Sequence, residues 1–153
     1  MFGKETSPFA KVVTAALEET RQRGDRRLGT EHLLLGLLRD PDSPTARALG
    51  VRVADARAAL DALDQAALKA IGIDVGVPPK SRPRRHPAVP GTALTTSARA
   101  AINQAIKATT RRTRDTAPNH LLLVLLAQSR PDPVAELLDE LRIDRSASRA
   151  RLT

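Results

Sequence analysis

The chain has 153 residues, and 25 Lys and Arg against 17 Asp and Glu give it a formal net charge of +8. Hydrophobic residues make up 41% of the sequence, which is enough for a core. That core must be aliphatic, because the chain has two Phe, one Met and no Tyr or Trp. The absence of cysteine excludes disulfides, thiolate zinc sites, iron–sulfur clusters and a cysteine nucleophile. The sequence shows neither a membrane span nor a signal peptide, so we expect a cytoplasmic protein.

The first predicted helix covers residues 6–23, where apolar side chains recur at i, i+3, i+4 and i+7. Thr6 stands three residues before this stripe, where its hydroxyl can cap free amide groups at the helix start. The stripe consists of Phe9, Val12, Val13, Ala16 and Leu17.

Three more helices are predicted in the first half of the chain. One begins at Thr30, in the block 29–38, and is apolar nearly all round, as expected of a central buried helix. After a short Pro/Asp loop comes a short helix that contains Ala46 and Leu49, and then a longer one over roughly residues 53–70.

Residues 74–93 are predicted to form an extended, exposed linker between residues 1–73 and 94–153. Five prolines fall in this segment, and proline disfavours both helix interiors and strand ladders. The segment also holds four cations within six residues, with no acid among them: Lys80, Arg82, Arg84 and Arg85.

The second half of the chain repeats the first. Its apolar stripe begins at Ala98, with Thr95 as the matching cap, and the block 117–126 returns the block 29–38 at an offset of 88. A short helix containing Ala135 and Leu138 and a last one near residues 144–152 complete the series. Four helices therefore occur twice. We predict an all-α fold, a pseudo-two-fold pair of four-helix units that together form one compact domain.

The sequence contains no recognisable catalytic constellation. Three histidines without cysteine give no H-E-x-x-H pair, no G-x-x-x-x-G-K-S/T phosphate loop exists, and no G-x-S-x-G elbow is present. We therefore expect a protein that is not an enzyme and holds no metal or cofactor. His32 and His120 occupy matching positions, and we expect them to hydrogen-bond neighbouring loops rather than to bind ligands.

Glu31 admits two interpretations. In the first turn of a helix, a carboxylate is stabilised by the free N–H groups and the helix dipole by ~0.3–1 kcal/mol. Alternatively, Glu31 presents its oxygen pair to a guanidinium, while helix-start N–H groups and the Thr6 hydroxyl bind a phosphate. The two groups together would recognise a phosphorylated arginine.

The block Gly-Thr-Glu-His-Leu-Leu-Leu-Gly-Leu-Leu at 29–38, placed 23 residues after Thr6, resembles the N-terminal substrate-recognition domain of Clp chaperone ATPases. It is most similar to the ClpC type, whose fold is a duplicated four-helix repeat. The second motif departs from the family pattern, with Asn119 where Glu is usual. The long 54–76 segment and the basic linker resemble small free-standing actinobacterial proteins that consist only of this domain.

The resemblance implies a ligand. ClpC-type domains use a Thr and a Glu in each repeat to bind phosphoarginine, a degradation mark. Thr6 and Glu31 match that pattern in the first repeat. In the second, Thr95 matches, but Asn119 has no charge to pair with a guanidinium. We therefore predict one site at Glu31 and at most a weak second site.

The resemblance also implies a peptide groove. The helices predicted at 6–23 and 95–113 are expected to pack near the pseudo-two-fold axis, and the family holds adaptor proteins and cyclic peptide antibiotics on this face. Phe2 either anchors such ligands or merely covers the core, and Leu94 replaces a Phe that is common in the family. The predicted groove residues are Phe2, Val12, Val13, Leu94, Thr95 and Arg99.

These features predict a non-catalytic binding module that captures peptides, client proteins, adaptors or ClpC-targeting cyclic peptides. Such a module would deliver cargo to a ClpC–Clp protease system or sequester it. The alternative is a basic nucleic-acid-binding regulatory protein, because the +8 charge could neutralise phosphates. The chain lacks aromatic residues for base stacking, so this alternative predicts only weak, non-specific binding.

Overall fold

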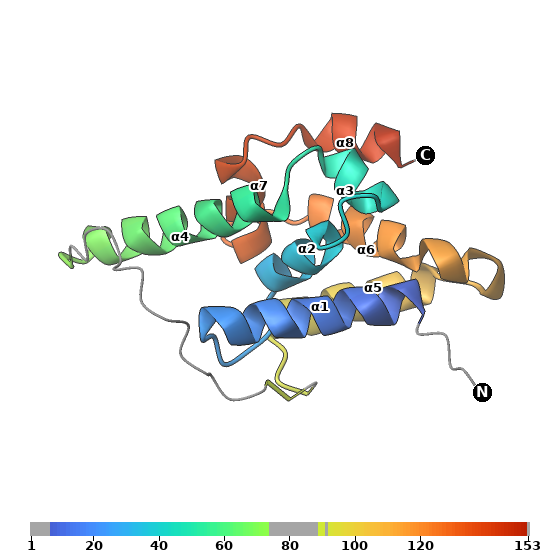
Figure 1. The fold of residues 1–153 in the computed structure, drawn as a ribbon, viewed down its shortest axis with the longest axis horizontal. Coiled ribbons are helices and arrows are strands. Elements are labelled where there is room, and N and C mark those ends of the chain that lie inside the picture. Colours follow the sequence, from blue (N-terminus) through green and yellow to red (C-terminus); the bar gives the residue numbers. More distant parts are fainter. Residues whose placement is uncertain (1–6, 74–88, 91, 153) are drawn as a thin grey trace.

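The structure is a computed structural model that describes residues 7–73, 89–90 and 92–152 (Figure 1). In this part of the chain it contains eight α-helices and no strands, which confirms the predicted all-α fold. The predicted linker at 74–93 lies mostly outside the described residues, so the proposed domain boundaries stay a prediction. The elements are α1 (Pro8–Arg23), α2 (Thr30–Leu38), α3 (Pro44–Leu49), α4 (Val53–Ala70), α5 (Thr96–Ala108), the 3-10 helix η1 (Arg111–Thr116), α6 (Ala117–Leu126), α7 (Pro133–Glu140) and α8 (Arg145–Arg151).

The two halves are related by contacts that repeat across a pseudo-two-fold axis. Helix α1 packs on α2 and α6, and α5 packs on α6 and α2. Likewise α4 packs on α7, and α8 packs on α3. The first helices of the two repeats were expected near the axis, and this prediction is wrong. Helices α2 and α6 contact each other there, whereas α1 and α5 have no described Cα atoms within 8 Å of one another.

The core consists of leucines from the two central helices, as their apolar sequences predict. In α2 the side chains of all five leucines are buried, and α6 buries four of its five. Gly36 allows α1 to approach α2, because a Cβ at this position would collide with the backbone carbonyl of Val12. No helix in the described part is long and apolar enough to cross a membrane.

The helix starts follow the predicted chemistry, with two differences. Thr95 caps α5, because its hydroxyl accepts from the Ala98 N–H at 3.1 Å. In the first repeat the capping residue is Ser7, whose hydroxyl accepts from Ala10 N–H, and not Thr6, which lies outside the described residues. The predicted helix 95–113 ends at Ala108, because the backbone becomes extended at the following threonine and η1 forms after it.

Candidate functional site

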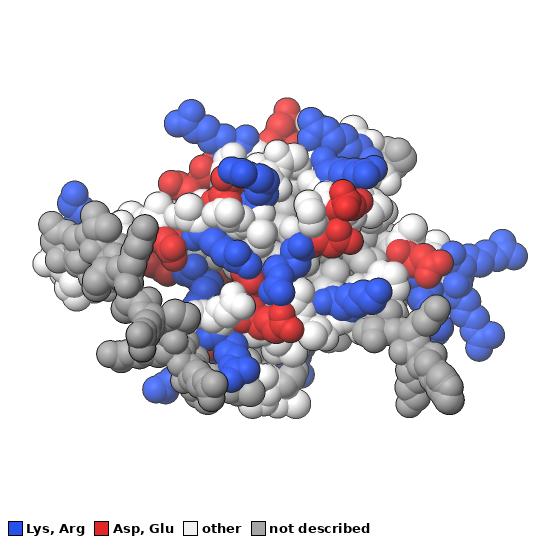
Figure 2. Space-filling model, viewed as in Figure 1, with Lys and Arg blue, Asp and Glu red and all other residues white. Residues whose placement is uncertain are grey.

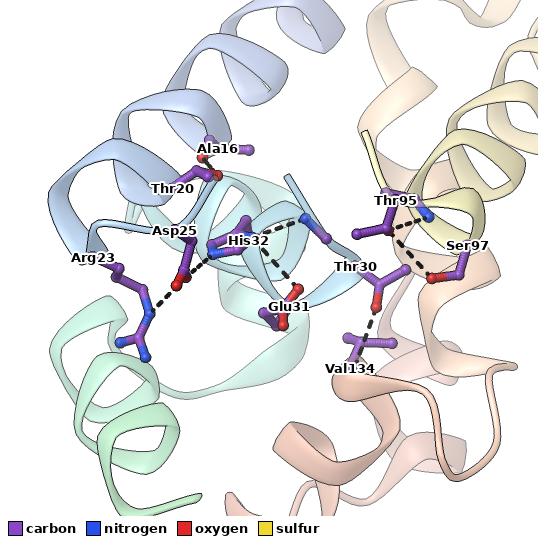
Figure 3. A network of polar contacts seen from close by, with 12 residues as sticks. Ala16, Thr20, Arg23, Asp25, Thr30, Glu31, His32, Thr95, Ser97 and Val134 are labelled. Carbon is purple, nitrogen blue, oxygen red and sulfur yellow. Dashed lines mark hydrogen bonds and ion pairs between the residues drawn. The ribbon is translucent and has the colours of Figure 1, made fainter. Parts of the chain in front are cut away.

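The start of α2 is organised by His32, as Figure 3 shows. The Gly29 N–H donates to Nδ1 of His32 at 2.9 Å, so the ring proton lies on Nε2, which donates to Asp25 Oδ2 at 2.7 Å. Nδ1 of His120 hydrogen-bonds the Thr109 hydroxyl at 3.1 Å. Both histidines therefore contact a neighbouring loop, as predicted, and the expectation that they bind no ligand stays a prediction.

Glu31 is a half-buried carboxylate without a strong cationic partner. Its side chain is 20% exposed and folds back over Gly29, where a Cβ would overlap the carboxylate. Nδ1 of His32 lies 3.4 Å away, but that nitrogen already accepts from Gly29 and cannot donate. Among the described residues no Lys or Arg pairs with Glu31 within 4 Å. Burial raises the pKa of Glu31, and neighbouring His32, a backbone hydrogen bond and Arg23 oppose this only in part.

Because the pKa of Glu31 is raised, we expect Glu31→Gln to stabilise the folded protein at neutral pH. The folded state binds the Glu31 proton more tightly than the unfolded chain, so wild-type stability is lost as pH rises through the folded pKa, above 4.5. Glu31→Gln removes this loss, and urea unfolding should find the variant more stable than wild type at pH 7, with the difference shrinking towards pH 4. A variant less stable at pH 7, or a difference independent of pH, would contradict this account.

Beside Glu31, the end of α1 is tied to α4 by one arginine. The Arg23 guanidinium, 14% exposed, lies 2.9 Å from Asp61 and 2.6 Å from Asp64, and its Nε lies 3.5 Å from Asp25. Burial alone would raise the pKa of Asp25, but His32 and Arg23 lower it below its ordinary value. Arg23 therefore pairs with the aspartates around Glu31 and forms no ion pair with Glu31 itself.

These side chains line a cavity of about 450 Å³ that both repeats build. The segments before α2 and α5 run side by side, with Leu28 N–H donating to the Ala93 carbonyl and Thr95 N–H donating to that of Leu28. This pairing brings the start of α5 to the start of α2. The lining residues are Arg23, Asp25, Arg27, Glu31, His32, Leu60, Asp64, Thr95, Ser97 and Pro133.

Hydrogen bonds of Thr30, next to Glu31, also join the two repeats. The Thr30 hydroxyl donates to Asp132 and accepts from the Val134 N–H at 3.3 Å, so the first turn of α2 is joined to that of α7. Thr30 was predicted to open the α2 helix, and the helix does begin there, with Gly29 as the capping residue.

The structure brings the predicted ligand residues together in other combinations than the sequence analysis expected. Glu31 shares its cavity with Thr95 of the other repeat. Asn119 and Val12 line a second cavity of about 600 Å³ together with Pro8 of α1. Thr6, the predicted partner of Glu31, lies outside the described residues, and so does Phe2.

The predicted groove residues do not line one described cavity. Val13 and Leu94 are half-buried, whereas Arg99 is exposed, and its guanidinium donates to the Thr92 carbonyl at 3.5 Å. None of these three lines the cavity of Glu31 or that of Asn119. The groove therefore stays a prediction.

Some site residues escaped the sequence analysis. Arg27 and Ser97 could have been suspected, since one belongs to the charged stretch before α2 and the other follows the Thr95 cap. Asp64 and Pro133 carry no local signal and reach the cavity only through tertiary packing. Within the described residues no group of three His, Cys, Asp or Glu could hold a metal ion.

Together, the fold and the cavity define a duplicated helical domain with a polar pocket where its repeats meet. A family model described as "Clp repeat (R) N-terminal domain" matches residues 4–82, and the chain belongs to this family. Its fold is that of the N-terminal domain of the caseinolytic protease associated chaperone ClpD from Arabidopsis thaliana. The TM-score with that structure is 0.62 at 19% identity, over 99% of this chain and 91% of that one.

Part of this chain is also similar in sequence to the N-terminal regions of Clp proteins. The negative regulator of genetic competence ClpC/MecB of Bacillus subtilis is 45% identical over 49 residues, which is 32% of this chain and 6% of that protein. The chaperone protein ClpB of Oceanobacillus iheyensis is 43% identical over 49 residues, 32% of this chain and again 6% of the relative. The match thus spans only a small part of these relatives.

Proposed function

We infer that the chain is a non-catalytic binding module that recognises peptides or client proteins and holds phosphoarginine in the cavity at Glu31. The observation that carries this is the half-buried Glu31 carboxylate, which pairs with no described Lys or Arg and shares a cavity with Thr95 and Ser97. Membership of the Clp repeat family supports the general role, because its relatives include chaperones and ATP-binding subunits of Clp proteases.

Each half of the ligand finds a complementary group. A guanidinium donates two parallel N–H groups to a carboxylate, and Glu31 is the lining carboxylate that Arg23 does not occupy. A phosphate accepts hydrogen bonds from hydroxyls, and those of Thr95 and Ser97 stand at the α5 start. Exposed Arg27 adds positive charge at the rim.

We further infer a cytoplasmic role beside a ClpC-type ATPase. A module that binds marked clients would deliver them to the protease system or sequester them from it. Adaptor proteins and ClpC-targeting cyclic peptides would bind the predicted groove.

Glu31→Ala should abolish most phosphoarginine binding. The change removes the free guanidinium acceptor and leaves a cation among the positive N–H groups of a helix start. One charge-assisted bidentate contact is worth ~1.5–3 kcal/mol, so the affinity should fall roughly ten- to a hundred-fold. Isothermal titration calorimetry with phosphoarginine measures this directly, and circular dichroism checks that the variant stays folded.

Asn119 provides the matched control. Asn119→Ala should change the affinity little, whereas Asn119→Glu should create or strengthen a second site in the other cavity. Calorimetry should then find one site in the wild type and two in Asn119→Glu. Equal losses from Glu31→Ala and Asn119→Ala, or no binding at millimolar phosphoarginine, would refute the ligand and leave only peptide recognition.

A further inference from the structure

The two repeats differ in how they neutralise the arginines that follow their first helices. At the offset of 89 that relates the first helices of the two repeats, Arg23 corresponds to Arg112. Arg23 is paired with Asp25, Asp61 and Asp64, whereas among the described residues no carboxylate oxygen lies within 4 Å of the guanidinium nitrogens of Arg111, Arg112 or Arg114. The second repeat therefore presents cations that lack the counter-charges of the first.

Two equivalent helices differ in their described length. Asp61 and Asp64 come from α4, which has 18 residues and extends well beyond the neighbouring helices (Figure 1). Its counterpart α8 has 7 residues, contains no acid and ends at Arg151. No described helix thus occupies, beside η1, the position that α4 occupies beside the end of α1.

An exposed apolar side chain accompanies these cations. Ile106, in the last turn of α5, is 54% exposed, although its counterpart Leu17 in α1 is partly buried against the core. It is one of three large hydrophobic residues exposed in the described part of the chain. We call the set formed by Ile106, Lys107, Arg111, Arg112 and Arg114 the η1 patch. Figure 2 shows Lys and Arg side chains projecting from the end of the molecule that carries η1.

The η1 patch rests on a defined backbone. The Thr110 N–H donates to the Thr113 hydroxyl at 2.8 Å, and the Thr116 hydroxyl donates to the Thr113 carbonyl at 3.0 Å. No residue of η1 is buried, so its arginines are not required for the core. Asp115 is the single acid from 107 to 116, and it lines the Asn119 cavity with Asp40 and Asp42.

We propose that the η1 patch docks an acidic amphipathic helix of a partner protein, which supplies the carboxylates that α4 supplies in the first repeat. The matching spacing is that of Asp61 and Asp64, i and i+3, because residues three apart lie on one helix face. An apolar residue beside them would cover Ile106. Nucleic acid fits less well, since a phosphate backbone offers nothing apolar to Ile106.

A synthetic peptide tests this docking. The probe is a helical peptide of ~18 residues made of Glu, Leu and Ala, with glutamates at i and i+3 beside a leucine stripe. A scrambled peptide of the same composition is its control. On the protein, Arg111→Ser with Arg112→Ser is compared with Arg47→Ser and Arg149→Ser, exposed arginines elsewhere, so that both double variants lose the same charge.

Fluorescence anisotropy at low salt should show binding of the ordered peptide to wild type. The affinity should fall at least about ten-fold in the η1 double variant and less than about two-fold in the control. Ile106→Ser should also weaken it, while phosphoarginine binding stays unchanged in all variants. Equal losses of peptide affinity in both double variants, or equal binding of the scrambled peptide, would mean that binding depends on net charge alone. Either result would overturn the proposal. Tighter binding of a DNA duplex at the same arginines would overturn it in favour of nucleic acid.

Discussion

Leu34→Asp and Leu122→Asp should each unfold the protein. Both side chains are completely buried, at equivalent positions in the two central helices. An unpaired buried charge costs several kcal/mol, which is a large part of the ~5–15 kcal/mol stability of a small domain. Circular dichroism should show loss of helical signal at 25 °C or a thermal transition lowered by tens of degrees.

Ala58→Asp is the matched control for this pair. Ala58 is exposed on α4, so an aspartate introduced there stays solvated and should lower the stability by no more than ~1 kcal/mol, mainly through helix propensity. A melting temperature that stays at the wild-type value in either leucine variant would contradict the central position of that helix.

The helices were predictable because each is encoded locally. The α4 bounds agree with the prediction because its apolar spacing is long and regular and the chain reverses at Gly72, where φ is +89°. The α1 cap was misplaced by one residue, because Thr6 and Ser7 are adjacent capping residues. Ser7 is the capping residue because Pro8 follows it, and proline is favoured at the first helical position.

The arrangement of the site depends on contacts that no local pattern encodes. Glu31 and its place in the first turn of α2 were predictable from the block 29–38. The sequence, however, suggested Thr6 as its partner, whereas the pairing of Leu28 with Leu94 brings Thr95 to the cavity. Asp64 is 41 residues from Arg23 along the chain, and only the direction of α4 brings the two together.

Glu19→Ala should be the most destabilising change of a polar residue. The side chain is 1% exposed, and both of its oxygens accept from Arg57 at 2.7 Å, while Arg39 donates to Oε2 at 2.9 Å. These contacts join α1 to α4 and to the end of α2. Removing the carboxylate leaves the Arg57 guanidinium without its partner, so the free energy of unfolding should fall by about 3 kcal/mol.

Acid should reproduce part of this loss in the wild type. Burial by itself raises the pKa of Glu19, but hydrogen bonds and charge from Arg57 and Arg39 lower it below its ordinary value. The stabilisation is therefore complete above the unfolded pKa near 4.5 and is lost as pH falls through the folded pKa. Urea unfolding at pH 7 and at pH 3 should show the wild type and Glu19→Ala converging in acid. Glu18→Ala serves as the control. That side chain is 53% exposed and its one ion pair among the described residues is with Arg39, so its removal should cost less than ~1 kcal/mol. Equal losses from the two variants at pH 7 would mean that the three-helix ion cluster does not stabilise the fold.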